Sequence, residues 1–150
     1  MPAIRNISVG LPVKDGHVLV LCGRDRSLGQ DFYRAIGGGI EFGERAEEAL
    51  HREFREELDV TLDGSTLLAV SENLFTYEGE PGHEIAHIFA VASADLDALP
   101  LDAELEVLDE GSPVRWVPVA ELRDGVRPLF PSGAPHALFA LADEPVIADA

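Results

Sequence analysis

The chain has 150 residues, of which 46% are hydrophobic and 26% charged, a composition that suits one folded domain. Its formal net charge of −17 repels nucleic acid and anionic membranes, so we expect neither intact DNA or RNA nor a lipid surface as a partner. No apolar run approaches the roughly 18 residues of a membrane span, and the first residues lack the layout of a signal peptide. Cys22 is the single cysteine, which excludes an internal disulfide and favours a reducing, cytoplasmic setting. A small phosphorylated ligand stays compatible with this charge, because a cation or a few arginines can reverse the field in one cleft.

The first third of the chain predicts strands. Apolar residues alternate with polar or small ones over 7–13, which indicates a strand with one buried face. Residues 14–16 have the composition of a turn, and 17–22 would return as the second strand of a hairpin. A short strand over 32–36 leads into three glycines at 37–39, which allow backbone angles closed to other residues.

The pattern changes to a helix over 44–58, with neither Pro nor Gly inside it and with Gly43 as an acceptable N-cap. Strands over 67–75 and 84–92 are expected next, then a long acidic loop, 93–113. A short strand over 114–117 and a last helix over 136–142 complete the series. Because neither a repeat nor a linker interrupts it, residues 1–150 are expected to form one mixed α/β domain.

The helix carries carboxylates on its apolar side. At about 100° per residue, its apolar stripe consists of Ala46, Leu50, Phe54 and Leu58. Glu57 falls inside this stripe at roughly −20° from Leu50, Glu53 at its edge at roughly −60°, and Glu56 at roughly −120°. A carboxylate turned toward a core costs several kcal/mol unless it is compensated. Arg52 and Arg55 are expected on the far side of the helix, so a bound Mg²⁺ or Mn²⁺ is the expected compensation. A solvated acidic face is the alternative.

The residues around this helix follow a known motif. Five residues separate Gly38 from Glu44, and seven more precede the run 52–60, Arg-Glu-Phe-Arg-Glu-Glu-Leu-Asp-Val. This arrangement over 38–60 resembles the Nudix box, G-x5-E-x7-R-E-U-x-E-E-x-G-U, in which U is a bulky apolar residue. Asp59 stands where the family has glycine. Because Asp is among the few residues that tolerate a left-handed conformation, we expect a small stability cost and no loss of chemistry.

Resemblance to the Nudix, or MutT-like, family implies the Nudix fold, an α/β/α sandwich with a central mixed sheet. It implies a metal-dependent hydrolase, in which water attacks phosphorus and splits the diphosphate linkage of a nucleoside diphosphate derivative. The substrates considered are dinucleoside polyphosphates, nucleoside triphosphates, ADP-ribose and nucleotide sugars. A homodimer is common in the family. The implied metal ligands are the backbone carbonyl of Gly38 and the carboxylates of Glu53, Glu56 and Glu57.

The resemblance also implies supporting residues. Glu44 and Arg52 would pair and brace the loop against the helix, although each taken alone is equally well explained as an exposed charge. Some MutT-like enzymes carry a glutamate on a late loop, six residues before a tryptophan, in an E-G-x-P setting, and Glu110 has this layout. Glu110 is therefore a candidate metal ligand or catalytic base beside Glu53 and Glu57. One more acid in an acidic loop is the alternative.

Two further residues are candidate substrate contacts. Arg34 flanks the glycine-rich loop, where it could hold phosphate or a polar base. Tyr77 stands seventeen residues after Val60, where the family's diadenosine polyphosphate group carries a tyrosine. A lone aromatic residue at a strand end is otherwise explained by packing.

Two alternative functions have to be weighed. Residues 83–87 spell H-E-x-x-H, which on a helix indicates a zinc peptidase. The segment has the pattern of a strand, which would separate the Cα atoms of His83 and His87 by about 13 Å, too far for one Zn²⁺. The second alternative is a Nudix-like domain that binds a nucleotide and regulates without turnover. The presence of Glu53, Glu56 and Glu57 counts against it.

Overall fold

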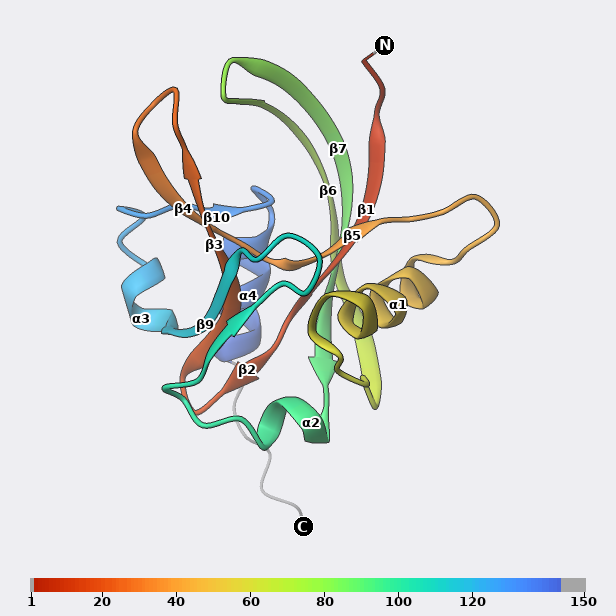
Figure 1. The fold of residues 1–150 in the computed structure, drawn as a ribbon, viewed down its shortest axis with the longest axis vertical. Helices are drawn as coiled ribbons and strands as arrows, with labels where there is room; N and C mark the ends of the chain where they lie inside the picture. Colours follow the sequence, from red (N-terminus) through yellow and green to blue (C-terminus); the bar gives the residue numbers. More distant parts are fainter. Residues whose placement is uncertain (1, 144–150) are drawn as a thin grey trace.

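The fold consists of two β-sheets with helices packed against them, and a computed structural model describes residues 2–143 of it (Figure 1). Residue 1 and residues 144–150 of the expected domain lie outside the described residues. The expected mixed α/β class is confirmed, and the strands divide into two sheets in place of one central sheet. Within residues 2–143, no helix is both long enough and apolar enough to cross a membrane.

The first sheet has four strands in the order β5-β1-β7-β6. They are β1 (Arg5–Leu11), β5 (Ile36–Gly39), β6 (Gly64–Tyr77) and β7 (Glu80–Ala92). β1 runs parallel to β7, and the other pairs are antiparallel, so the sheet is mixed.

The second sheet follows the order β10-β4-β3-β9-β8, with β2 paired to β3. Its strands are β2 (Val13–Lys14), β3 (His17–Asp25), β4 (Gln30–Arg34), β8 (Glu104–Glu106), β9 (Pro113–Pro118) and β10 (Leu129–Phe130). The helices are α1 (Ala46–Leu58), α2 (Ala94–Asp97), α3 (Val119–Leu122) and α4 (Ala134–Ala142). The predicted hairpin is confirmed only at its turn, where Lys14 pairs with His17 and where Asp15 and Gly16 have φ angles of 48° and 72°. Most of the expected first strand is β1, which pairs with β5 and β7 in the first sheet and not with β3.

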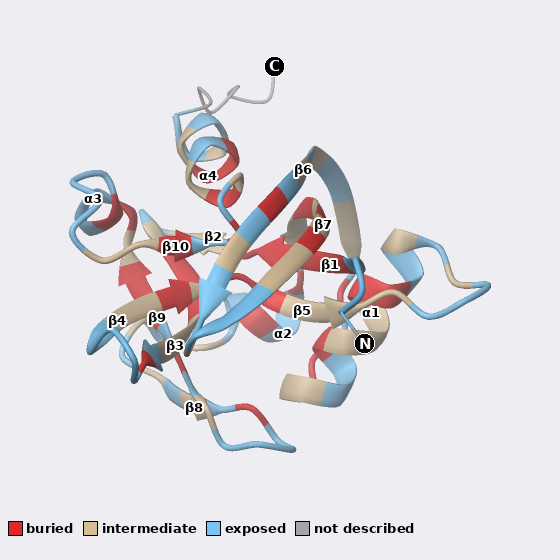
Figure 2. Ribbon diagram, turned by 90° about the horizontal axis from the view of Figure 1, so that it is seen from above, coloured by how far each residue is buried: buried red, intermediate tan, exposed pale blue. Residues whose placement is uncertain are grey.

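Strand β1 differs from its expected form, because both of its faces are buried over Ile7–Leu11 (Figure 2). The alternation of apolar and small residues predicts one exposed face, and helix α1 covers that face instead. The hydroxyl of Ser8 donates to the carbonyl of Ala46 at 2.6 Å. A Cβ atom at Gly10 would come within 2.9 Å of the Phe54 ring. The small residues of β1 therefore give α1 room to pack closely.

Two apolar clusters hold the layers together. One contains Leu50 and Phe54 of α1 with Leu19 of β3 and Trp116 of β9. The other contains Leu138 of α4 with residues of β1, β3, β4, β7 and β9. Because residues on β9 alternate between the two clusters, its neighbouring side chains point to opposite faces of the second sheet.

Two sequence-based boundaries were wrong. Helix α1 begins at Ala46, two residues later than expected, and its N-cap is Arg45 rather than Gly43. The carboxylate of Glu48 accepts a hydrogen bond from the N–H of Arg45 at 3.1 Å. This bond satisfies a backbone N–H group at the start of the helix that has no partner within the helix. The acidic segment 93–113 is not all loop, because it contains α2 and β8.

Candidate active site

The acidic motif ends in a tightly closed helix terminus. Asp59, the C-cap of α1, has φ 55° and ψ 41°, and its N–H donates to the carbonyl of Arg55 at 3.0 Å. The N–H of Val60 donates to the carbonyl of Phe54 at 3.3 Å. The expected left-handed conformation at Asp59 is therefore confirmed, and it lets the chain turn away directly after the last glutamate.

Gly38 on β5 lies directly against the carboxylate of Glu53 on α1. A Cβ atom at Gly38 would stand 2.6 Å from the Glu53 carboxyl carbon and 2.7 Å from each carboxylate oxygen. The Glu53 side chain is only 14% exposed. Only glycine at this position lets the carboxylate approach the backbone so closely, so two of the residues expected to bind the metal are neighbours.

Arg52 connects the loop before α1 with the glutamates on the helix. Its guanidinium donates to both carboxylate oxygens of Glu44, at 2.8 and 2.9 Å, and to the carbonyl of Gly39 at 2.9 Å. It also donates to Glu53 at 3.0 Å and to Glu56 at 3.2 Å. The expectation that Arg52 points away from these glutamates was therefore wrong, because its long side chain reaches back along the helix. The hydrogen bonds from Arg52 hold the pKa of Glu44 down at about 2, with a further contribution from the N–H of Glu41.

Glu57 is the carboxylate that Arg52 does not reach. Its Oε2 atom is buried and has no hydrogen-bond partner among the described residues. Desolvation, followed by repulsion from Glu53, Asp109 and Glu110, raises the pKa of Glu57 to about 8. A buried carboxylate beside other carboxylates is costly without a positive charge nearby. The position of Glu57 therefore fits a group that binds a cation.

The late acidic loop closes over the end of α1. The N–H of Leu108 donates to the backbone carbonyl of Glu57 at 2.9 Å, and the N–H of Gly111 donates to the carbonyl of Val107 at 2.8 Å. Glu110 is exposed, and its carboxylate accepts a hydrogen bond from the hydroxyl of Ser112. This loop brings Glu110 close enough to act on the pKa of Glu57, although the two residues are far apart in the sequence.

The helix wheel separates the three helix glutamates correctly, because Glu53 and Glu57 are partly buried and Glu56 is exposed. Glu57 has a buried oxygen, Glu53 is 14% exposed and Glu56 is 60% exposed. Over residues 2–143, no three His, Cys, Asp or Glu side chains are gathered as tightly as the ligands of one bound ion. The oxygen-only donor set, the unpartnered Glu57 oxygen and the close approach of Gly38 nevertheless fit a hard divalent cation.

A buried carboxylate on β7 was missed by the sequence-based reasoning. Glu84 is 4% exposed and lies between two arginines, with Arg5 Nη1 at 3.3 Å and Arg34 Nη2 at 3.4 Å. The side chain of Arg34, an expected substrate contact, is therefore held by Glu84. In the sequence, Glu84 is notable only as the middle of the H-E-x-x-H pattern. The pairing of β7 with β1 places it opposite Arg5, which explains a carboxylate at this position.

The remaining candidates lie on β6 and β7. Tyr77 packs edge-on against Phe32, with ring centroids 5.9 Å apart, and its hydroxyl donates weakly to the carbonyl of Arg24 at 3.5 Å. The H-E-x-x-H segment lies within strand β7, as expected, so His83 and His87 are not one helical turn apart. His83 instead lies 3.3 Å from the carboxylate of Glu72 on the neighbouring strand. The contacts of Tyr77 are thus with the β3–β4 hairpin, and the helix required for a zinc peptidase motif does not occur here.

Comparison with known families decides the class of this site. The family model of the NUDIX domain matches residues 4–138. This chain belongs to the Nudix family. One relative of this Nudix hydrolase is the nucleoside triphosphatase NudI of Escherichia coli O139:H28, which is 32% identical over 123 residues. That match covers 79% of this chain and 84% of the relative.

Other matches are shorter or structural. An RNA pyrophosphohydrolase from Teredinibacter turnerae is 39% identical over 70 residues, covering 47% of this chain and only 40% of the relative's length. The MutT Nudix hydrolase of Burkholderia pseudomallei superimposes with a TM-score of 0.58 at 23% identity, covering 79% of this chain and 85% of that one. A mutator MutT protein from Bacillus halodurans superimposes with a TM-score of 0.64 at 19% identity, covering 94% and 84%. The Nudix fold and a hydrolase of pyrophosphate bonds in nucleoside diphosphate derivatives are therefore confirmed.

Proposed function

We propose that this Nudix hydrolase cleaves a nucleoside triphosphate, with a divalent cation, Mg²⁺ or Mn²⁺, held by Glu53, Glu56, Glu57 and the carbonyl of Gly38. The observation that carries the metal site is the buried, unpartnered Oε2 atom of Glu57 beside Glu53 and Glu110. A cation there would offset the repulsion between these carboxylates, and their oxygen-only chemistry favours Mg²⁺ or Mn²⁺ over zinc.

The substrate class is supported by charge and by a relative that is matched over most of its length. The relative named a nucleoside triphosphatase is matched over 84% of its length, whereas the RNA pyrophosphohydrolase is matched over 40% of its length. A protein of net charge −17 repels an RNA chain more strongly than it repels a single nucleotide. Tyr77, which favoured dinucleoside polyphosphates, is already packed against Phe32. A free nucleoside triphosphate is therefore the preferred substrate class.

The protein's own residues would divide the work of positioning and proton transfer. A bound divalent cation supplies charge neutralisation at the phosphate oxygens and lowers the pKa of water. Arg52 fixes Glu53 and Glu56 in place while it ties α1 to the carbonyl of Gly39. Holding these oxygens in advance reduces the ordering that substrate binding would otherwise require.

Glu110 is the preferred general base. Glu53 and Glu56 are engaged by Arg52, and Glu57 is proposed as a ligand. Glu110 lies on an exposed loop beside Glu57 and forms no ion pair with an arginine or lysine of residues 2–143. Its carboxylate oxygen is thus available to accept a proton from the attacking water.

The test is a panel of nucleoside triphosphates, dinucleoside polyphosphates, ADP-ribose and a 5′-triphosphorylated RNA, incubated with Mg²⁺ and analysed by mass spectrometry. We expect turnover to be fastest with a nucleoside triphosphate and to fall to background in Glu56→Gln. Glu47→Gln, a change of the same charge in the exposed first turn of α1, is the matched control and should retain activity. Equal turnover in wild type and Glu56→Gln would refute the enzyme proposal and favour a nucleotide-binding regulator. Preference for the RNA would refute only the substrate class.

The role of Glu110 is tested separately. Glu110→Gln should lower kcat on the order of 10²-fold while Mg²⁺ binding, measured by calorimetry, is unchanged. The acidic limb of the pH–rate profile should also be lost. An equal loss of Mg²⁺ affinity would instead identify Glu110 as a metal ligand.

A further inference from the structure

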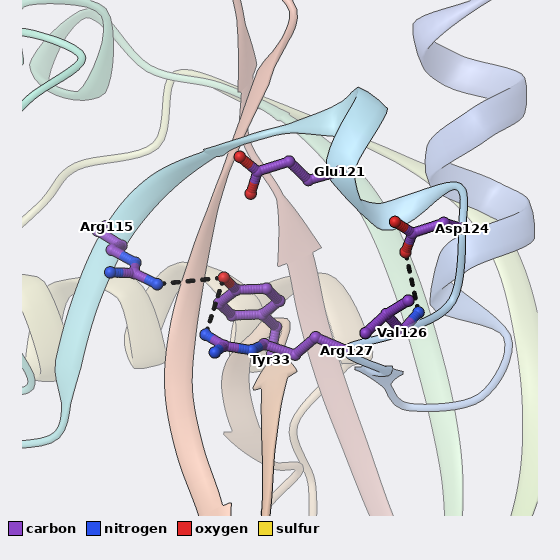
Figure 3. A pocket seen from close by; sticks show the side chains of 6 residues that line it. All are labelled: Tyr33, Arg115, Glu121, Asp124, Val126 and Arg127. Carbon is purple, nitrogen blue, oxygen red and sulfur yellow. Dashed lines mark hydrogen bonds between the residues drawn. The ribbon is translucent and has the colours of Figure 1, made fainter.

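A polar pocket lies on the second sheet, away from the carboxylates of α1 (Figure 3). It has a volume of about 380 Å³ and is lined by Tyr33, Arg115, Glu121, Asp124, Val126 and Arg127. On β9, the neighbours of Arg115, Val114 and Trp116, belong to the apolar cluster that packs against α1. Arg115 therefore points away from α1 and its glutamates, because adjacent residues of a strand face opposite sides.

Two arginines converge on one hydroxyl group in this pocket. Tyr33 accepts a hydrogen bond from Arg115 Nη2 at 3.1 Å and another from Arg127 Nη1 at 3.0 Å. Figure 3 shows the two guanidinium groups approaching the hydroxyl from β9 and from the segment before β10. Two like charges that share one acceptor repel each other, so an anion between them would lower the free energy of the arrangement.

The carboxylates nearby neutralise these arginines only in part. Among residues 2–143, Arg115 has no carboxylate within 4.0 Å, and Arg127 reaches Asp31 only at 3.5 Å. Asp31 is closer to Arg24, at 2.8 Å. In a chain with a net charge of −17, two neighbouring arginines of which only Arg127 has a carboxylate within 4.0 Å are a local exception.

The hydroxyl of Tyr33 adds a third donor. Both arginines donate to its oxygen, and the hydroxyl proton has no acceptor among the described residues. The ring itself is buried, at 4% exposure, and Arg127 stacks over it with its guanidinium carbon 4.9 Å from the ring centroid. Two guanidinium groups and one hydroxyl group, held beside a buried aromatic ring, have the chemistry of an anion site. Guanidinium groups suit phosphate oxygens in particular.

We propose that this pocket binds a small phosphate monoester, with its phosphate between Arg115 and Arg127. Its hydroxyl-bearing part would face Glu121, a carboxylate on the pocket wall that can accept hydrogen bonds. The volume lies within the range of small-molecule sites, about 300–1,000 Å³, and exceeds what a bare phosphate would fill. The site requires neither the metal nor the glutamates of α1, so it is independent of the proposed hydrolase function.

The test is calorimetric titration of the full chain in EDTA with inorganic phosphate and, separately, with ribose 5-phosphate. EDTA excludes turnover and binding through a divalent cation. We expect ribose 5-phosphate to bind more tightly than phosphate, and Arg115→Gln or Arg127→Gln to weaken it by about tenfold or more. Tyr33→Phe, which removes one donor and keeps the ring, should weaken it less.

Two controls make the result decisive. Arg26→Gln removes the same charge from an 87% exposed arginine outside the pocket and should leave affinity unchanged within about twofold. Glu57→Gln should also leave it unchanged. No detectable binding of either probe, or equal weakening by Arg26→Gln and Arg115→Gln, would overturn the proposal. Tighter binding of inorganic phosphate would keep the anion site and overturn the sugar-phosphate assignment.

Discussion

Two regions of the molecule hold side chains of like charge close together: the carboxylates at the end of α1, and Arg115 and Arg127 in the pocket beside β9. The two regions are assembled in different ways. Glu53 and Glu57 are four residues apart on one helix, so their proximity follows from the helical repeat alone. Arg115 and Arg127 reach Tyr33 from separate segments, and only strand pairing brings them together. In both places the repulsion between like charges favours a partner of opposite charge, which is the proposed cation at α1 and the proposed anion beside β9.

The two regions also differ in how much of the charge the protein itself balances. Arg52 offsets Glu44, Glu53 and Glu56 within a single network. Of the four glutamates at the fixed positions of the motif (44, 53, 56 and 57), this leaves Glu57 without a cationic partner among the described residues. Tyr33 offers the arginines behind β9 a neutral acceptor and no negative charge. The carboxylate region is therefore largely organised before any ligand binds, and this difference can be tested by substitution.

The largest effect is expected from Glu57→Gln. Removing this carboxylate should lower kcat/KM on the order of 10³-fold, because the expected cation loses the buried Oε2 atom. Saturating Mg²⁺ should raise the Tm of the wild type and not of this variant, as measured by differential scanning calorimetry. Equal Mg²⁺ stabilisation of both proteins would contradict the assignment of Glu57 as a ligand.

Gly38→Ala comes next and tests the close approach between backbone and carboxylate. Its Cβ atom would stand 2.6 Å from the Glu53 carboxyl carbon, so Glu53 has to move and kcat should fall by about 10- to 100-fold. Gly39→Ala is the matched control, since the nearest atom to its Cβ would be Arg5 Nη2 at 3.6 Å. Steady-state kinetics of both variants give the comparison, and similar losses would show that the contact with Glu53 is not the cause.

Glu44→Gln tests whether the Arg52 network contributes to stability as well as to catalysis. The pKa of Glu44 is lowered from 4.5 to about 2 in the folded protein, so the folded state binds fewer protons than the unfolded state between these values. The stability that Glu44 contributes should be fully present above pH 4.5 and lost as the pH falls toward 2. Urea unfolding should show a gap between wild type and variant at pH 7 that closes near pH 2. A gap that is independent of pH would point to packing alone.

Asp59→Gly should have the smallest effect. The left-handed conformation at φ 55° is unfavourable for an L-residue, and a negative charge at a helix C-terminus opposes the helix dipole. Glycine removes both costs, so the free energy of unfolding should rise by about 1 kcal/mol with kcat unchanged. Chemical denaturation measures the gain. Asp59→Ala, which keeps the conformational cost, should not be stabilised to the same extent.

The sequence predicted the local parts of the fold and site well. The turn through Asp15 and Gly16 follows from its residue composition. The strand nature of the H-E-x-x-H segment and the greater exposure of Glu56 compared with Glu53 follow from repeats of two and 3.6 residues. The helix start at Ala46 and the elements inside 93–113 were not predicted, because caps and short strands depend on individual hydrogen bonds. The reach of Arg52 was missed because a helix wheel places Cα atoms and not the ends of long side chains.

By itself, the sequence determined the acidic motif, its left-handed cap and the family, because these depend on residues within one helix and its flanking loop. The tertiary structure decided which charges are compensated. The pairing of β7 with β1 brings Arg5 beside the carboxylate of Glu84, and the loop over α1 brings Glu110 beside Glu57. The pairing of β3 with both β4 and β9 carries Tyr33 and Arg115 to one face of the second sheet. Strand register and burial depend on residues far apart in the chain, so no local pattern contains them.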